Sequence, residues 1–180
     1  PSKIRKTIIN HLLADLSTND ISRFKYADLS CGCGGFLVDL AVEINKITGK
    51  PLTQICHENI FGLDITDYAI ERTKLLLSFV CILRGEDRNI DFNLWVTDAL
   101  SFDMNTIGQL DVIVGNPPYV CGRNISEECK NSILKWRVCA SGNTDLYIPF
   151  IQLAIESIKD GGRMGYITMN SFLNSLNGRV

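Results

Sequence analysis

A short polar segment, Asn116-Pro117-Pro118-Tyr119, directly follows the apolar run of residues 110–115. Two consecutive prolines stiffen the backbone and remove two N–H donors, so the segment presents carbonyl oxygens as acceptors. The Asn116 side chain and the Pro117 carbonyl can each accept one hydrogen bond, and Tyr119 adds an aromatic face. Two acceptors beside a ring suit a planar amino group, which carries two N–H donors. Asn116, Pro117, Pro118 and Tyr119 are therefore the candidate catalytic residues.

A second segment, residues 28–36, begins with Asp28 and reads Asp-Leu-Ser-Cys-Gly-Cys-Gly-Gly-Phe. Glycines permit positive φ and let a ligand approach backbone N–H groups at the start of a helix. A tight turn without a ligand is the structural alternative for this segment. Leu37 stands where a Gly-x-Gly-x-x-Gly dinucleotide motif would have its third glycine. This departure disfavours a nicotinamide cofactor.

Two further carboxylates follow apolar segments: Asp64 comes after residues 59–63, and Asp98 comes after residues 91–96. An acidic side chain at the end of the second strand of such a fold can accept hydrogen bonds from a ribose. Asp98 can accept one from the exocyclic amino group of an adenine. The structural alternatives are a helix N-cap for Asp64 and a solvated loop position for Asp98.

Strand-like and helix-like segments alternate along the chain, which is typical of a parallel sheet wound with helices. In such a sheet, ligands bind at the carboxyl ends of the strands, where all four segments would meet. The middle of residues 68–84 is almost entirely apolar, which predicts a helix buried on several sides. We expect a loop over residues 49–57 and a long loop or flap over residues 120–143. The predicted strands are 24–29, 59–63, 91–96, 110–115 and 163–169, and the predicted helices are 4–16, 36–47, 68–84, 144–158 and 170–177.

The 180 residues correspond to one domain, and a net charge of −2 gives no global attraction to nucleic acid. Any contact with DNA would have to come from a local patch or from protein outside these residues. No signal peptide is visible, and the longest apolar run is too short to span a bilayer, so we expect a cytoplasmic protein without a membrane partner. The seven cysteines lack the paired spacing of a zinc site. We therefore expect buried, reduced thiols and no metal.

In this order, the glycine segment, Gly62-Leu63-Asp64, Asp98-Ala99 and the Asn-Pro-Pro-Tyr segment resemble the S-adenosylmethionine-dependent amino-group methyltransferases. In particular, they are similar to the DNA adenine-N6 methyltransferases of bacterial restriction-modification systems. The resemblance covers nearly the whole chain. Residues 1–4 are similar to the end of that family's Thr-Pro-x-x-Ile segment, and residues 146–150 and 159–172 to its next helix and fifth strand. Leu29 and Cys33 depart from the family's usual residues without blocking the backbone role of the loop.

The resemblance implies an α/β, Rossmann-like class I methyltransferase fold with a mostly parallel sheet and helices on both faces. It implies one S-adenosylmethionine-dependent methyltransferase domain over residues 1–180, truncated before its C-terminal strands, with the target-recognition domain absent. It also implies S-adenosyl-L-methionine as cofactor, with its methionine end at the glycine segment, its ribose at Asp64 and its adenine at Asp98. The implied cofactor-binding residues are Asp28, Ser30, Cys31, Gly32, Gly34, Phe36, Asp64, Ile65, Asp98, Ala99 and Asn116.

The implied activity is methyl transfer to the N6 amino group of adenine in double-stranded DNA. The enzyme would be the modification subunit, or modification part, of a restriction-modification system. DNA would be held largely by regions outside this chain, and a restriction or specificity subunit would be a further partner. Four alternatives stay open: a protein glutamine methyltransferase, an RNA adenine methyltransferase, an NAD-dependent oxidoreductase, and a cofactor-binding fragment without turnover.

Overall fold

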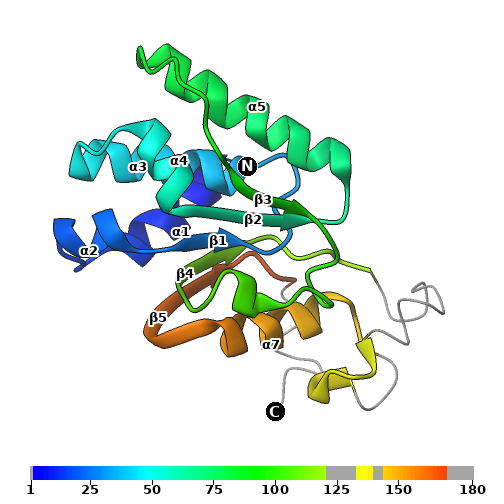
Figure 1. Ribbon diagram of the computed structural model, residues 1–180. Coiled ribbons are helices and arrows are strands. Elements are labelled where there is room, and N and C mark those ends of the chain that lie inside the picture. Colours follow the sequence, from blue (N-terminus) through cyan, green and yellow to red (C-terminus); the bar gives the residue numbers. More distant parts are fainter. Residues whose placement is uncertain (1, 121–132, 140–143, 170–180) are drawn as a thin grey trace.

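A computed structural model of the chain describes residues 2–120, 133–139 and 144–169 (Figure 1). The strands are β1 (Tyr26–Asp28), β2 (Ile60–Asp64), β3 (Asn93–Val96), β4 (Leu110–Gly115) and β5 (Ile158–Tyr166). The helices are α1 (Ser2–Leu13), α2 (Thr18–Arg23), α3 (Gly35–Thr48), α4 (Leu52–Glu58), α5 (Asp67–Leu83) and α7 (Tyr147–Ser157), with 3-10 turns η1 (Met104–Thr106) and η3 (Arg137–Cys139).

The five described strands form one sheet in the order β3-β2-β1-β4-β5, and every neighbouring pair is parallel. The expectation of a mostly parallel α/β sheet is therefore confirmed. The chain runs outward from β1 to β3 and then crosses back to β4 on the other side of β1. The carboxyl ends of β1 and β4 consequently flank the point where the strand order reverses, which is where such sheets bind ligands.

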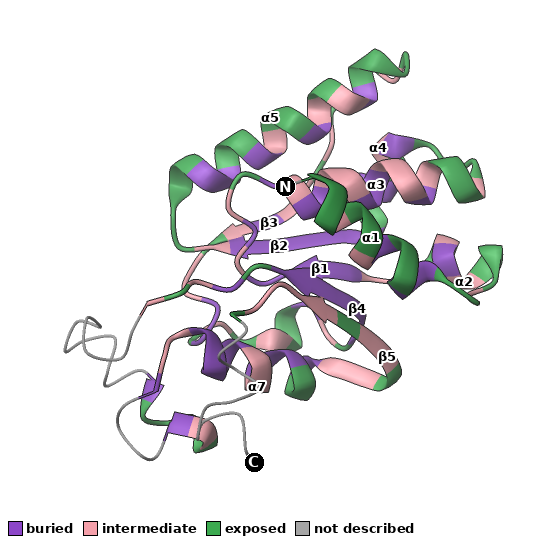
Figure 2. Cartoon of the chain, turned by 180° about the vertical axis from the view of Figure 1, so that it is seen from behind, coloured by how far each residue is buried: buried purple, intermediate pink, exposed green. Residues whose placement is uncertain are grey.

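Helices cover both faces of the sheet, as the sequence predicts (Figure 1). Along β1, Tyr26 packs into the core beneath α1 to α5, and its neighbour Ala27 packs into the core beneath α7. Along β4, Val112 and Val114 belong to the first core and Ile113 to the second. Burying both faces explains the continuous apolar composition of β4, since successive side chains point to opposite sides. Figure 2 shows the buried residues concentrated along β1, β2 and β4.

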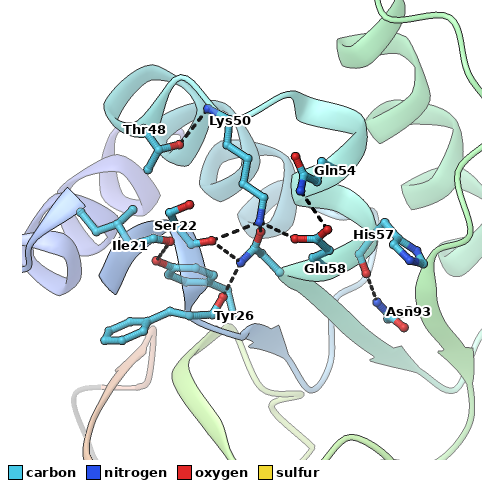
Figure 3. A network of polar contacts seen from close by, with 11 residues as sticks. Ile21, Ser22, Tyr26, Thr48, Lys50, Gln54, His57, Glu58 and Asn93 are labelled. Carbon is cyan, nitrogen blue, oxygen red and sulfur yellow. Dashed lines mark hydrogen bonds and ion pairs between the residues drawn. The ribbon is translucent and has the colours of Figure 1, made fainter. Parts of the chain in front are cut away.

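A polar network holds the amino-terminal side of β1 and β2 (Figure 3). The Lys50 ammonium donates to the Ser22 carbonyl (3.1 Å), the Glu58 carboxylate (2.7 Å) and the Asn59 side-chain oxygen (2.7 Å). The Asn59 amide in turn donates to the carbonyls of Ser22 (3.1 Å) and Phe24 (2.8 Å). The network thereby joins the end of α2, the turn between α3 and α4, and the start of β2.

The predicted loop over residues 49–57 is wrong, because α4 occupies most of it. The Glu86 carboxylate accepts hydrogen bonds from the backbone N–H groups of Leu52 (2.9 Å) and Thr53 (2.8 Å) at the start of α4. It thus satisfies donors that a helix of this length leaves free at its N-terminus. A cap supplied from so far along the chain leaves no local signal. Helix α2 was also not predicted, although Ser17, whose hydroxyl accepts from the Asp20 N–H at 3.1 Å, is a recognisable N-cap.

Helix α5 is not buried on several sides as predicted. Only one stripe of the helix, which includes Ile70 and Leu77, packs onto α3, β2 and β3. On its outward face Leu75 is 59% exposed, Phe79 60% and Leu83 81%, and Figure 2 shows this face alternating with the buried stripe. The apolar composition of residues 68–84 fits a helix buried on several sides, but it fits equally well a helix that buries one apolar face and exposes another.

The fifth strand begins earlier than predicted, at Ile158 instead of residue 163. Gly161 and Gly162 lie inside β5, where the pairing with β4 shifts register between Leu110 and Val112. A shift of this kind places extra residues on one strand, so the glycines mark an irregular strand segment and not its boundary. Most of the predicted flap over residues 120–143 and the predicted helix over residues 170–177 lie outside the described residues.

Replacing Asn59 by Ala tests the polar network. Asn59 is 1% exposed, and its removal leaves the Phe24 carbonyl without its side-chain donor and takes one hydrogen bond each from the Ser22 carbonyl and the Lys50 ammonium. We expect Asn59→Ala to lower the free energy of unfolding by about 2–3 kcal/mol, measured by urea denaturation. Gln54→Ala is the control, because Gln54 makes only an exposed hydrogen bond to Glu58. Its cost should stay below about 0.5 kcal/mol. Equal losses in the two variants would contradict the role given to Asn59.

Candidate active site

A pocket of about 330 Å³ opens at the carboxyl ends of β1 and β4. It joins the glycine segment that follows β1 to the polar segment that follows β4, two regions far apart in sequence. Six of the predicted cofactor-binding and catalytic residues line this pocket, together with four residues that were not among those predictions. The lining residues are Ile4, Arg5, Asp28, Ser30, Cys31, Gly32, Gly35, Phe36, Asn116 and Ile167.

The glycine segment is held from two sides. The Gly32 N–H donates to the Asp64 carboxylate (2.8 Å), and the Thr73 hydroxyl of α5 donates to the Gly32 carbonyl (3.0 Å). Gly34, the N-cap of α3, has φ 75°, and a Cβ there would lie 2.6 Å from the Thr73 methyl carbon. The segment therefore has one conformation that only glycine fits at position 34, and its backbone forms one wall of the pocket.

Asp28 lies at the end of β1 and is only 2% exposed. Burial raises the pKa of this carboxyl from 3.8 to about 7, although one oxygen accepts a hydrogen bond from the Ser30 N–H at 3.0 Å. Gly115 leaves the space that Asp28 needs, since a Cβ there would lie 2.9 Å from the carboxyl and 3.1 Å from the Tyr166 ring. The Tyr166 hydroxyl is buried with no hydrogen-bond partner among the described residues. Burial and the nearby Asp28 raise its pKa.

Asp64 and Asp98 lie side by side along the same edge, because β2 and β3 are paired and the Thr97 N–H donates to the Asp64 carbonyl. The second oxygen of the Asp64 carboxylate accepts from the Thr66 N–H at 2.9 Å, so this residue also supports the turn into α5. Asp98 accepts from the Leu100 N–H at 3.0 Å. Neither carboxylate lines the pocket described above. The structure thus separates the predicted site into a pocket and a neighbouring acidic edge.

Two of the apolar residues that the resemblance implies for the cofactor lie at this acidic edge with opposite exposure. Ile65, which follows Asp64, is 74% exposed, and Ala99, which follows Asp98, is buried. An exposed isoleucine beside two carboxylates provides an apolar surface next to hydrogen-bond acceptors.

The predicted catalytic segment sits at the mouth of the pocket. Pro117 is buried, Pro118 is half-buried, and Asn116 and Tyr119 are exposed. The Tyr119 hydroxyl lies 2.6 Å from the Asn116 side-chain oxygen and 2.5 Å from the Ile167 carbonyl. A phenol has one proton, so it can donate to only one of these two acceptors. The Asn116 side-chain oxygen, which the sequence assigns to a substrate amino group, is therefore already in contact with the Tyr119 hydroxyl.

Some residues of the site were missed by the sequence reasoning. Arg5 and Ile4 enter the pocket from α1, and Ile167 enters from the end of β5. Thr73 supports the glycine segment from the middle of a helix. No local pattern marks these residues, because each reaches the site only through tertiary packing.

Among the described residues, no group of three or more His, Cys, Asp and Glu side chains is arranged to hold a metal ion. The cysteines there are unpaired, and Cys33 in the glycine segment is exposed, whereas Cys31, Cys56, Cys81 and Cys139 are buried. The described helices include none with the length and apolar character needed to cross a membrane.

The parallel sheet, its strand order and the position of the glycine segment define a class I S-adenosylmethionine-dependent methyltransferase fold. Among solved structures, a class I S-adenosylmethionine-dependent methyltransferase from Listeria monocytogenes superposes with a TM-score of 0.71 at 13% identity, covering 99% of this chain and 47% of that one. A nuclease-deletion mutant of the Type ISP restriction-modification enzyme LlaGI, solved with a DNA substrate mimic, has a TM-score of 0.76 at 14% identity. That match covers 98% of this chain and 18% of the enzyme.

The chain belongs to the Eco57I restriction-modification methylase family, whose model matches residues 58–180. It is 28% identical to the Type II methyltransferase M.BanIII of Aneurinibacillus aneurinilyticus over 189 aligned residues, which cover 99% of this chain and 31% of the relative. The chain spans less than a third of the length of the curated relatives it matches. The resemblance drawn from the sequence is therefore confirmed at the level of the family.

The raised pKa of Asp28 predicts how stability depends on pH. Between pH 4 and 7 the unfolded chain has lost the proton that the folded protein keeps, so rising pH favours unfolding. We expect Asp28→Asn, which remains neutral, to gain stability relative to the wild type as pH rises from 5 to 7. The difference should grow by at most about 1.4 kcal/mol per pH unit. Urea unfolding at pH 5, 6, 7 and 8 measures it.

Asp160→Asn is the control for that comparison, because Asp160 is an exposed carboxylate near the start of β5. Because Asp160 is solvent-exposed, this substitution should change the free energy of unfolding by less than about 0.5 kcal/mol. If the Asp28→Asn difference does not grow between pH 5 and 7, Asp28 is not held protonated by burial.

Proposed function

We propose that the protein transfers a methyl group from S-adenosylmethionine to the N6 amino group of adenine in double-stranded DNA. It would do so as the modification subunit, or modification part, of a restriction-modification enzyme. The observation that carries this proposal is the shared pocket. The glycine segment with Asp28 and the acceptor segment with Asn116 line the same cavity. A donor bound at the first and an amino group held at the second would be in contact.

The residues present suit the proposed cofactor. Gly32 has φ 52° and nothing within 4 Å of the position of a Cβ, so a ligand can approach its backbone closely. Asp28 provides a buried carboxyl for a cationic group, and the acidic edge provides acceptors for a ribose at Asp64 and an adenine at Asp98. Ile65 would cover one face of that adenine. Bound S-adenosylmethionine would supply an electrophilic methyl group on a sulfonium.

The acceptor segment would prepare the substrate. The lone pair of an adenine amino nitrogen is delocalised into the ring, which makes it a poor nucleophile. If the Asn116 side-chain oxygen and the Pro117 carbonyl each accept one of its N–H groups, the nitrogen moves toward tetrahedral geometry and its lone pair becomes available. Positioned acceptors of this kind act mainly by orientation and electrostatics, so no strong base is needed. The new N–C bond would form as the C–S bond of the sulfonium breaks, with neutral S-adenosylhomocysteine as the leaving group. The amino nitrogen, cationic after transfer, would then lose one proton to water at the exposed Asn116.

A base in duplex DNA must leave the stack before it can reach this pocket. Tyr119 offers an aromatic face for it, and the Asn116 oxygen can still accept from the amino group, because an amide oxygen has two lone pairs and the Tyr119 hydroxyl can donate to the Ile167 carbonyl instead. The proposal leaves recognition of the DNA sequence to parts of the protein outside residues 1–180, with a restriction or specificity subunit as a further partner. A cytoplasmic location follows from such a substrate.

An acceptor assay in the full-length protein tests the proposal directly. With tritium in the transferred methyl group, we expect label in double-stranded DNA, in the form of N6-methyladenine. Label in RNA or in a protein glutamine instead would favour the corresponding alternative enzyme. Failure to label any of the three, together with failure to bind S-adenosylhomocysteine, would overturn the assignment as a methyltransferase.

Asn116→Ala tests the acceptor role. The variant should lower the rate of methyl transfer about a hundred-fold or more, which is typical when one positioned hydrogen-bonding group is removed from an active site. Its affinity for S-adenosylhomocysteine, measured by calorimetry, should remain nearly unchanged. Asn105→Ala, in the exposed turn η1, is the control and should retain full activity. Methyl transfer by Asn116→Ala at the wild-type rate would refute the mechanism.

Asp64 requires a comparison of two variants, because it contacts Gly32 and is also proposed to bind the ribose. Asp64→Ala should weaken binding of S-adenosylhomocysteine about ten-fold or more, since it removes both interactions. Thr73→Val removes only the other hydrogen bond to Gly32 and should cost less. If the two variants lose the same affinity in calorimetry, Asp64 acts through the glycine segment alone and does not bind the ribose.

A further inference from the structure

Arg5 is a cation at the pocket that the proposed function leaves without a role. It lies on α1, and its guanidinium Nε donates to the Asp39 carboxylate of α3 at 2.7 Å. A Cβ on Gly35 would lie 3.1 Å from the central guanidinium carbon and 3.2 Å from Nη1, so the group rests against the start of α3. The ion pair and this contact fix the direction of a side chain that would otherwise be long and flexible.

The Arg5 guanidinium has donors to spare. It carries five N–H groups, and among the described residues it makes only the hydrogen bond to Asp39. Its side chain is 26% exposed. A planar guanidinium held in place with free N–H groups is well suited to bind a carboxylate through two parallel hydrogen bonds.

Asp28 lines the same pocket and selects the opposite charge. One of its oxygens accepts from the Ser30 N–H, and within the described part of the chain the other accepts no hydrogen bond. A cation bound beside this buried carboxyl stabilises its ionised form, whereas an anion there would oppose ionisation, so Asp28 favours a cationic group. A ligand that carries both an ammonium and a carboxylate would thus be oriented, with its ammonium toward Asp28 and its carboxylate toward Arg5.

We propose that the Arg5 guanidinium binds the carboxylate of the amino-acid end of the cofactor. This inference rests on the proposed function, because S-adenosylmethionine and its product S-adenosylhomocysteine both end in an amino acid. Arg5 is then a binding residue that makes the pocket selective for adenosine derivatives with an intact amino-acid carboxylate. Asp39 is its positioning residue.

The experiment compares two ligands that differ only in this carboxylate. S-adenosylhomocysteine and its decarboxylated analogue, which retains the amino group, are titrated by calorimetry into the full-length protein. We expect the wild type to prefer S-adenosylhomocysteine roughly ten- to hundred-fold, as for a hydrogen-bonded ion pair. Arg5→Met should lose that preference and bind the decarboxylated analogue about as well as the wild type does. Lys3→Met, which removes an exposed cation from the same helix, should keep the preference.

Arg5→Lys provides a second variant if Arg5→Met does not fold. It keeps the positive charge, but one ammonium replaces the planar guanidinium, so the preference should shrink without disappearing. A wild type that binds both ligands equally, or an Arg5→Met that keeps the wild-type preference, overturns the inference and leaves the proposed function intact. A wild type that binds neither ligand overturns the proposed function itself.

Discussion

The conformation of the glycine segment depends on one clamp, in which the Asp64 carboxylate accepts from the Gly32 N–H and the Thr73 hydroxyl donates to the Gly32 carbonyl. The two partners come from the end of β2 and from α5, so the pocket wall next to β1 is set by elements that follow it in sequence. A loop with positive φ at two glycines has little conformational preference of its own. The clamp supplies the order that lets its backbone act as a binding surface.

The two edges of the sheet have different roles. At the amino-terminal edge, Lys50 and Asn59 satisfy one another and the carbonyls around them, so their polar groups are committed to the fold. At the carboxyl edge, polar groups remain free: one oxygen of Asp28 accepts nothing in the described chain, and Arg5 has unused donors. Buried or half-buried polar groups without partners are costly in a purely structural setting. At the carboxyl edge these free groups line a pocket, which is what identifies that edge as the site.

The sequence predicted the functional edge better than it predicted the elements between the motifs. Asp28, Asn116 and the strands that carry them follow from local signals, namely apolar runs that end in glycine or proline. The parallel arrangement then brings the strand ends together without further information. What was missed depends on distant partners. Helix α4 is capped by Glu86, and Arg5 reaches the pocket because Asp39 holds it. The exposure of Leu75 and Phe79 could not be read from a helix that is apolar on two faces.

Because Gly115 of β4 has no side chain, side chains from the two neighbouring strands can pack against its backbone. The Asp28 carboxyl and the Tyr166 ring both approach the place where a Cβ would stand, from β1 on one side and from β5 on the other. A larger residue at 115 would require a smaller one at 28 and at 166 together, and the first of these provides the buried carboxyl of the pocket. Over evolutionary time these three positions are therefore expected to vary as a unit, so a homologue that has lost the glycine should have lost the acidic group as well.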